Sequence, residues 1–291
     1  MIEKRLNAIL FIGTILVFAP TWVWLGQAWL SDPYYSHGPL VLIVSLYFAW
    51  TQRHVITSEA KQTTTQVGIA LSQISFRATA GWIFLILALG IHVWAMAWQA
   101  YYLSALMIPL ALLGLLMALY GWQSAKRFWF PLAFLILMVP LPLAERFGPP
   151  LESFAATSAT TLAQWQGIAA RNDGAQVFLP NSTFTVGIPC GGLRSVIAII
   201  TLVVLLAYIV EGRWWARILI LFAAIPIALA ANTLRITLLF TIANTWGSDI
   251  AMNYFHDWSS PVLFLSAFAI LLALAKLVGC SDVRWQVVLP T

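Results

Sequence analysis

Residues 216–243 read ARILILFAAIPIALAANTLRITLLFTIA, an apolar run interrupted by two arginines. At about 1.5 Å per residue, a helix over this run is about 42 Å long and exceeds the roughly 30 Å hydrocarbon core of a bilayer. The stretch therefore predicts a helix that spans a membrane, and similar apolar runs recur from one end of the chain to the other.

The composition agrees with a membrane protein. Of 291 residues, 61% are hydrophobic and only 9% are charged, whereas soluble proteins carry about 25% charged residues. These values exclude a soluble globular enzyme, a disordered chain and a coiled coil. Two cysteines cannot form a disulfide framework, and no spacing resembles a zinc or iron–sulfur site, so neither a metal nor a cofactor is expected. The basic residues behind the net charge of +5 are scattered between apolar runs, so no nucleic-acid partner is expected either.

Hydropathy predicts an all-α polytopic membrane protein, with residues 1–291 forming a single integral membrane domain. The first span resembles the start of a signal peptide, but its apolar stretch is long and no A-x-A-like cleavage site follows, so we interpret it as an uncleaved helix. The eight predicted spans cover approximately residues 6–30, 36–52, 82–98, 101–121, 128–145, 190–210, 216–243 and 260–279.

The distribution of lysine and arginine predicts the orientation. Eleven of these residues fall on the side of the N-terminus, and only Arg146 and Arg171 fall on the other side. By the positive-inside rule, both termini should be cytoplasmic. On this topology residues 53–81 form a polar cytoplasmic loop, and residues 146–189 form the larger outer loop. Apolar and polar residues alternate over 175–188 around Pro180 and Asn181, which predicts a small β-hairpin before the sixth span.

Three chemically reactive or ionisable residues are predicted to lie at one level, the outer interface. Cys190 lies about 32 Å along the sixth span from the cytoplasmic Glu211, and Arg235 lies about 27 Å along the seventh span from Arg217. His256 falls in the short outer loop before the eighth span. Ionisable residues at such depths are candidate functional residues in membrane proteins.

Cys190 has the strongest local context of the three residues. Gly191 and Gly192 follow it, so a substrate backbone can approach closely, and the N-terminus of a helix favours the thiolate form. A free cysteine is also a common small apolar filler in membrane helices. Cys280 fits that filler role better, because it lies at the cytoplasmic end of the last span, too far from Cys190 for a disulfide.

Two arginines are candidates for binding an anion. Arg235 either meets an anion or extends toward the headgroups, and Asn232, three residues earlier on the same helix face, favours a buried polar patch. Arg194 lies four residues after Cys190 and either binds a substrate carboxylate, tunes the thiolate or pairs with Asp249 or Asp257.

Two histidines are predicted on the outer face. His256 is flanked by Asp257 and Trp258, and a lone histidine in a loop is more often a solvated surface residue than a catalytic one. Its functional interpretation rests on its position beside Cys190 and Arg235. His37 stands at the mouth of the second span, where it either shapes the same outer pocket or caps the helix.

Three spaced motifs and the eight spans together resemble the exosortase/archaeosortase family of membrane cysteine transpeptidases. The motifs are Cys190-Gly-Gly-Leu-Arg-Ser195, Asn232-Thr-Leu-Arg-Ile236 and His256, and Tyr35-Ser-His-Gly-Pro-Leu40 is similar to an early outer motif of the family. The resemblance places Cys190, Arg235 and His256 at the family's catalytic positions. Gly191, Gly192, Arg194, Asn232 and His37 are then candidates for substrate binding. One departure is visible, because the family usually has serine where Gly191 stands.

The resemblance also implies an activity and its partners. The family acts on secreted proteins that end in a short motif, a transmembrane helix and a basic cluster, called PEP-CTERM-type signals in bacteria. Such signals are cleaved at the outer face of the membrane, and the new C-terminus is transferred to an acceptor. The expected location is the cytoplasmic (inner) membrane of a Gram-negative bacterium, with membrane lipids around the chain. Two alternatives remain at this stage: a transporter or glycan-polymer export protein, and a structural subunit of a membrane complex, neither of which needs the cysteine.

Overall fold

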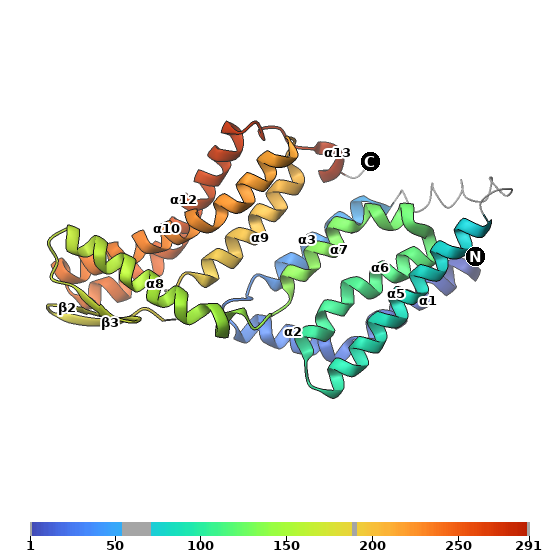
Figure 1. The fold of residues 1–291 in the computed structure, drawn as a ribbon, viewed down its shortest axis with the longest axis horizontal. Coiled ribbons are helices and arrows are strands. Elements are labelled where there is room, and N and C mark those ends of the chain that lie inside the picture. Colours follow the sequence, from blue (N-terminus) through green and yellow to red (C-terminus); the bar gives the residue numbers. More distant parts are fainter. Residues whose placement is uncertain (1, 54–70, 188–190, 290–291) are drawn as a thin grey trace. The chain divides into compact units, whose positions relative to one another are not determined.

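The computed structural model describes residues 2–53, 71–187 and 191–289, and most of them are helical (Figure 1). The chain falls into two compact units. The first unit comprises Met1–Pro140 together with Trp285–Thr291, and the second comprises Leu141–Arg284.

The first unit is a helical bundle. Its longest helices, α5 and α6, pack directly against each other along an interface of small residues. A side chain on Gly81 would overlap the backbone of Ala118, and one on Gly114 would overlap the backbone of Leu85, so glycine allows these helices to approach closely. The elements of the unit are α1 (Ile2–Val17), α2 (Ala19–Ser31), α3 (Gly38–Thr51), α5 (Leu71–Ala97), α6 (Tyr101–Arg127), α7 (Trp129–Phe134), the 3₁₀ helix η1 (Leu135–Met138) and α13 (Trp285–Val288).

The second unit combines helices with a small antiparallel sheet. Its three strands follow the order β1-β2-β3, and Val177 of β2 lies opposite Phe184 of β3. The predicted hairpin is thereby confirmed, while β1 is an addition that its polar sequence did not reveal. The elements are α8 (Leu143–Trp165), β1 (Arg171–Asp173), β2 (Gln176–Leu179), β3 (Ser182–Thr185), α9 (Leu193–Ile209), α10 (Trp214–Trp246), α11 (Ser248–Ile250), the π-helix η2 (Ala251–Phe255) and α12 (His256–Leu277).

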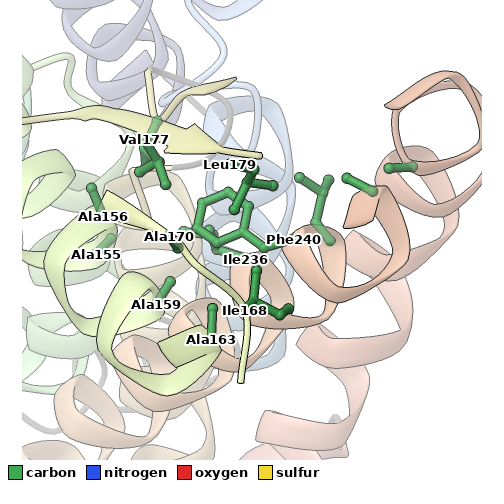
Figure 2. Packing of buried hydrophobic residues seen from close by; sticks show 14 residues of the cluster. Ala155, Ala156, Ala159, Ala163, Ile168, Ala170, Val177, Leu179, Ile236 and Phe240 are labelled. Atoms are coloured by element: carbon green, nitrogen blue, oxygen red, sulfur yellow. The ribbon is translucent and has the colours of Figure 1, made fainter. Parts of the chain in front are cut away.

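A shared hydrophobic cluster fixes the sheet against α8 and α10. Figure 2 shows the side chains of Val177 and Leu179 from β2 facing the small residues of α8 and the ring of Phe240 from α10. The ring of Phe184, on β3, packs 5.8 Å from that of Phe240, measured between centroids. The α8 face is built of alanines, which let the sheet lie close to the helix: Ala155, Ala156, Ala159 and Ala163.

A second cluster joins α9, α10 and α12, again through small residues on α10. After the last residues of α9 and α12, the two chain segments pair with each other. The backbone N–H of Glu211 donates to the carbonyl of Asp282 at 2.7 Å, and Val210 pairs with Val283. Cys280 is buried there against Gly212. Arg235, by contrast, lies in the half of α10 that packs against the sheet.

The predicted spans correspond to helices of unequal length. Among the described residues, four helices are long and apolar enough to cross a membrane: the apolar part of α5, α6, α10 and α12. The pair α1 and α2 adds a fifth candidate if a bend of 56° is accepted within one span. Helices α3 and α9 are shorter, so eight crossings and the cytoplasmic position of both termini remain predictions.

Several predicted boundaries differ from the structure. His256, predicted in a loop, is the first residue of α12, because the residues after α10 continue as α11 and the π-helix η2. The fifth predicted span, 128–145, is interrupted between Met138 and Leu143, because Pro140 and Pro142 cannot continue a hydrogen-bonded helix. Helix α5 begins at Leu71, so part of the predicted cytoplasmic loop is helical, and residues 54–70 of that loop lie outside the described residues.

Candidate functional site

One turn of α10 connects two of the sequence motifs. Asn232 and Arg235 are separated by three residues, so they share a face of the helix, and each is only 5% exposed. Asn232 contacts the start of α9, since a Cβ atom on Gly192 would lie 2.9 Å from the Asn232 Nδ2 atom. Arg235 contacts the start of α12, where its Nη1 donates a hydrogen bond to the Ser260 hydroxyl at 3.2 Å.

These two contacts bear directly on the predicted catalytic set. Gly192 comes two residues after Cys190, and Ser260 comes four residues after His256, which is one turn of α12 and about 6 Å of rise. Cys190 itself lies outside the described residues, and for His256 the structure describes the backbone, as the first residue of α12, but not the side chain. The turn of α10 around Asn232 and Arg235 therefore contacts the segments that follow both residues.

Arg235 also borders a cavity of about 360 Å³, a size typical of ligand sites. One wall is β3, the second is α10, and the third is formed by α11 and η2. The walls mix polar and apolar groups: Thr183, Phe184, Thr185, Val186, Arg235, Ile236, Leu239, Phe240, Ser248, Asp249 and Met252. A guanidinium group at the edge of such a cavity can bind a carboxylate or a developing oxyanion.

Glu152 of α8 is a site candidate that the sequence analysis missed. A Cβ atom on Gly191 would lie 2.5 Å from the Glu152 Cγ atom, so the glycine leaves room for this side chain. Burial raises the pKa of the Glu152 carboxyl above its ordinary value of 4.5. In the sequence, Glu152 is visible only as an isolated acidic residue near apolar neighbours. That pattern does not identify Gly191 as the residue it contacts.

The raised pKa of Glu152 predicts how stability depends on pH. Because the folded protein disfavours the charged carboxylate, the stability associated with a neutral Glu152 is lost as the pH rises above 4.5. Glu152→Gln should therefore raise the melting temperature of the detergent-solubilised protein at pH 7, and the gain should vanish below pH 4.5. Glu145→Gln is the control, because Glu145 is exposed in the first turn of the same helix, where a negative charge is favourable. A lower melting temperature for Glu152→Gln at pH 7 would contradict this account.

Gly192 occupies a conformation that favours glycine. Its φ is +85°, and it forms the N-cap of α9 beside Asn232. Gly192→Ala should cost about 1–2 kcal/mol from the left-handed backbone alone, and more from displacing the Asn232 amide. Gly167→Ala is a matched control, because Gly167 has the same φ of +85° with no atom within 4 Å of the added Cβ. Melting temperatures should fall further for Gly192→Ala than for Gly167→Ala, and equal losses would contradict the packing against Asn232.

The remaining predicted site residues occupy different environments. Arg194 is exposed in the first turn of α9, and among the described side chains it forms no ion pair with Asp249. His37 is half-buried in the first unit, where its Nε2 atom lies 3.2 Å from the carbonyl oxygen of Leu137. This contact ties the segment before α3 to η1, and the hydrogen bond from the Trp29 indole to the Met138 carbonyl at 2.9 Å ties α2 to the same helix.

A buried polar cluster in the first unit was also missed by the sequence analysis. The Ser104 hydroxyl lies 2.7 Å from Nδ1 of His92 and 2.6 Å from the hydroxyl of Thr21, so three helices meet through hydrogen bonds. Polar contacts of this kind hold apolar helices together. Within the described ranges, no group of three histidine, cysteine or acidic side chains could hold a metal ion.

Comparison with known proteins supplies one match. A family model described as transmembrane exosortase matches residues 29–273, which is well over half of the chain. No curated protein and no solved structure matches the chain. With the long apolar helices, this match identifies a multi-pass membrane protein.

Proposed function

Because the chain belongs to the transmembrane exosortase family, we propose that it is a membrane-embedded cysteine peptidase and transpeptidase. Its substrates are exported proteins that end in a PEP-CTERM-like signal, made of a short motif, a transmembrane helix and a basic cluster. Cleavage takes place at the outer face of the cytoplasmic membrane, and the new C-terminus is transferred to an acceptor. Cys190, Arg235 and His256 carry the chemistry.

The observation that supports this proposal best is the pair of contacts made by one turn of α10. Asn232 lies against Gly192, and Arg235 bonds to Ser260. A nucleophile just before Gly192 and a proton carrier one turn before Ser260 would thus flank a buried guanidinium group. A cysteine, a proton carrier and an oxyanion-binding cation are the three components that acyl transfer by covalent catalysis needs.

In the first step, the Cys190 thiolate attacks the scissile carbonyl carbon, and the carbonyl oxygen becomes an oxyanion bound by Arg235. When the tetrahedral intermediate collapses, the C–N bond breaks and His256 donates a proton to the leaving amine. A thioester between Cys190 and the new C-terminus of the substrate remains, and the segment with the transmembrane helix and the basic cluster is released.

In the second step, an acceptor nucleophile attacks the thioester carbonyl while His256 removes its proton. The C–S bond breaks and the Cys190 thiolate is regenerated. An amine acceptor gives transpeptidation, and water gives hydrolysis. Arg235 binds the oxyanion in both steps, which is consistent with its burial at the edge of a cavity rather than in the lipid-facing surface.

The proposal is tested with a secreted reporter protein that carries a PEP-CTERM-type signal, co-produced with this chain in a bacterium that has no exosortase. The expected result is a shorter reporter that depends on the intact chain. An unprocessed reporter in the presence of correctly inserted protein would contradict the proposed activity. Processing that persists without the Cys190 thiol would contradict the proposed chemistry.

A further inference from the structure

β3 lies at the edge of the sheet, next to the cavity beside Arg235. Among the described residues, the strand order β1-β2-β3 gives β3 a partner strand on one side only (Figure 1). Four successive residues, from Thr183 to Val186, line the cavity. An edge strand presents backbone donors and acceptors to any extended chain that lies beside it.

The register determines which backbone groups face outward. Val186 donates its N–H to the carbonyl of Ala175 at 2.8 Å, so residue 186 faces β2. Because the direction of N–H and C=O alternates along an antiparallel strand, Phe184 also faces β2, whereas Thr183 and Thr185 face away from it. Within the described ranges, no other segment forms a backbone hydrogen bond with Thr183, while the Thr185 carbonyl accepts from the N–H of Gly187 at 3.0 Å.

The outward groups of β3 match the backbone of an extended peptide. Thr183 offers one N–H and one C=O at the same position, which is the arrangement that a paired strand residue requires. The ring of Phe184 lines the cavity but is packed against the ring of Phe240. Phe184 and Val186 thus pack on the cluster shown in Figure 2, and the same stretch of chain from Thr183 to Val186 lines the cavity.

We propose that β3 binds the substrate by strand addition: an extended segment of the sorting signal pairs with Thr183 and Thr185 and passes alongside Arg235. This inference rests on the proposed function and specifies how the same site selects its substrate. Backbone pairing supplies the affinity, and the side chains that enter the cavity between β3 and α10 supply the selectivity.

The chemistry of the cavity favours a peptide over a lipid chain as its occupant. Thr183, Thr185, Ser248, Arg235 and Asp249 all contribute to its walls. An acyl chain would remove the outward N–H groups of β3 from water without offering an acceptor, which is costly. A peptide satisfies these groups and can also carry charged side chains to Arg235 and Asp249.

The position of β3 in the sequence connects this binding mode to cleavage. Thr185 precedes Cys190 by five residues, so the chain between them spans at most about 18 Å. A substrate segment paired with β3 is therefore held within a few residues of the proposed nucleophile. The strand acts as a positioning element and takes no part in bond making.

The test replaces the outward backbone donor and leaves the sheet intact. Thr183→Pro removes the N–H that points away from β2, and proline is tolerated on an edge strand where its missing N–H would point outward. Thr183→Ala removes the same side chain but keeps the N–H. Both changes are made in the Cys190→Ala background, and each protein is used in detergent to capture the reporter with the PEP-CTERM-type signal.

Capture by the Thr183→Pro protein should be roughly fivefold weaker than capture by the Thr183→Ala protein, as expected for one lost backbone hydrogen bond. A second reporter, from which the residues between the folded domain and the transmembrane helix are deleted, has no segment to pair with β3 and should bind both proteins equally. Equal capture of the intact reporter by the proline and alanine proteins would overturn strand addition. A difference that persists with the shortened reporter would also overturn it, because the change would then act on the transmembrane contacts or on the fold.

Capture is measured without cleavage, so its outcome is independent of the proposed chemistry. If the chain with Cys190 intact captures the reporter but never cleaves it, the proposed function fails while strand addition is still decided by the comparison of proline with alanine. If cleavage depends on Cys190 but capture does not distinguish the two variants, the function stands and strand addition fails.

Discussion

Replacing Cys190 with alanine is expected to reduce processing of the sorting-signal reporter by a factor on the order of 10⁴ or more, as is typical when the nucleophile of a catalytic set is removed. Without the thiol no thioester can form, and Arg235 and His256 have no alternative nucleophile to assist. The measurement is the fraction of processed reporter in cells that contain equal amounts of inserted protein.

The second cysteine provides the control for this experiment. Cys280 is buried beside Gly212, where the segment after α12 meets the segment after α9. Cys280→Ala should process the reporter at the rate of the unsubstituted protein. Processing that requires Cys280 but not Cys190 would contradict the assignment of the nucleophile, and the absence of any processing would favour a transporter or polymer-export protein over a peptidase.

Arg235→Ala should lower the rate of processing by a factor on the order of 10²–10³, the usual effect of removing one oxyanion donor. Arg235→Lys should recover only part of the rate, because an ammonium group cannot reproduce the planar fork of a guanidinium. The readout is the initial rate of processing at saturating reporter, which separates a loss of transition-state binding from a loss of substrate binding.

Two further variants test whether the effect is specific to Arg235 and whether it depends on its hydrogen bond to Ser260. Arg171→Ala removes an exposed arginine of β1 in the same unit and should leave the rate unchanged. Ser260→Ala removes the hydroxyl that accepts from Nη1 of Arg235, so it should lower the rate by a few-fold at most. If Arg171→Ala is as harmful as Arg235→Ala, general positive charge would be responsible, and the specific role of Arg235 would be contradicted.

Much of the fold could be predicted from local patterns. Most of the predicted spans overlap a helix, the first overlaps the bent pair α1 and α2, and the alternation over 175–188 correctly predicted the β2–β3 hairpin. Strand β1 could not be predicted, because Arg171-Asn-Asp173 has no strand-forming residues and forms a strand only by pairing with β2. The break after Met138 was visible in Pro140 and Pro142, but the surrounding apolar residues outweighed it in a hydropathy average.

The part of the candidate site that lies on a single helix could be predicted from the spacing of its residues. The spacing of Asn232 and Arg235 placed them on one face of α10, and the structure confirms that both are buried there. Their partners could not be predicted, because Gly192 and Ser260 belong to other helices and only tertiary packing brings them to this turn. Glu152 was missed for the same reason, since its contact with Gly191 joins two distant parts of the sequence.

The most direct test of the central claim is to intercept the thioester. The solubilised protein is incubated with the reporter and hydroxylamine, and the new C-terminus of the reporter is analysed by mass spectrometry. If Cys190 forms a thioester, hydroxylamine attacks its carbonyl and regenerates the thiol, so the reporter should end in a hydroxamate that is absent with Cys190→Ala. A reporter that is cleaved only to a free carboxylate under these conditions, or that gives the hydroxamate without Cys190, would contradict the account.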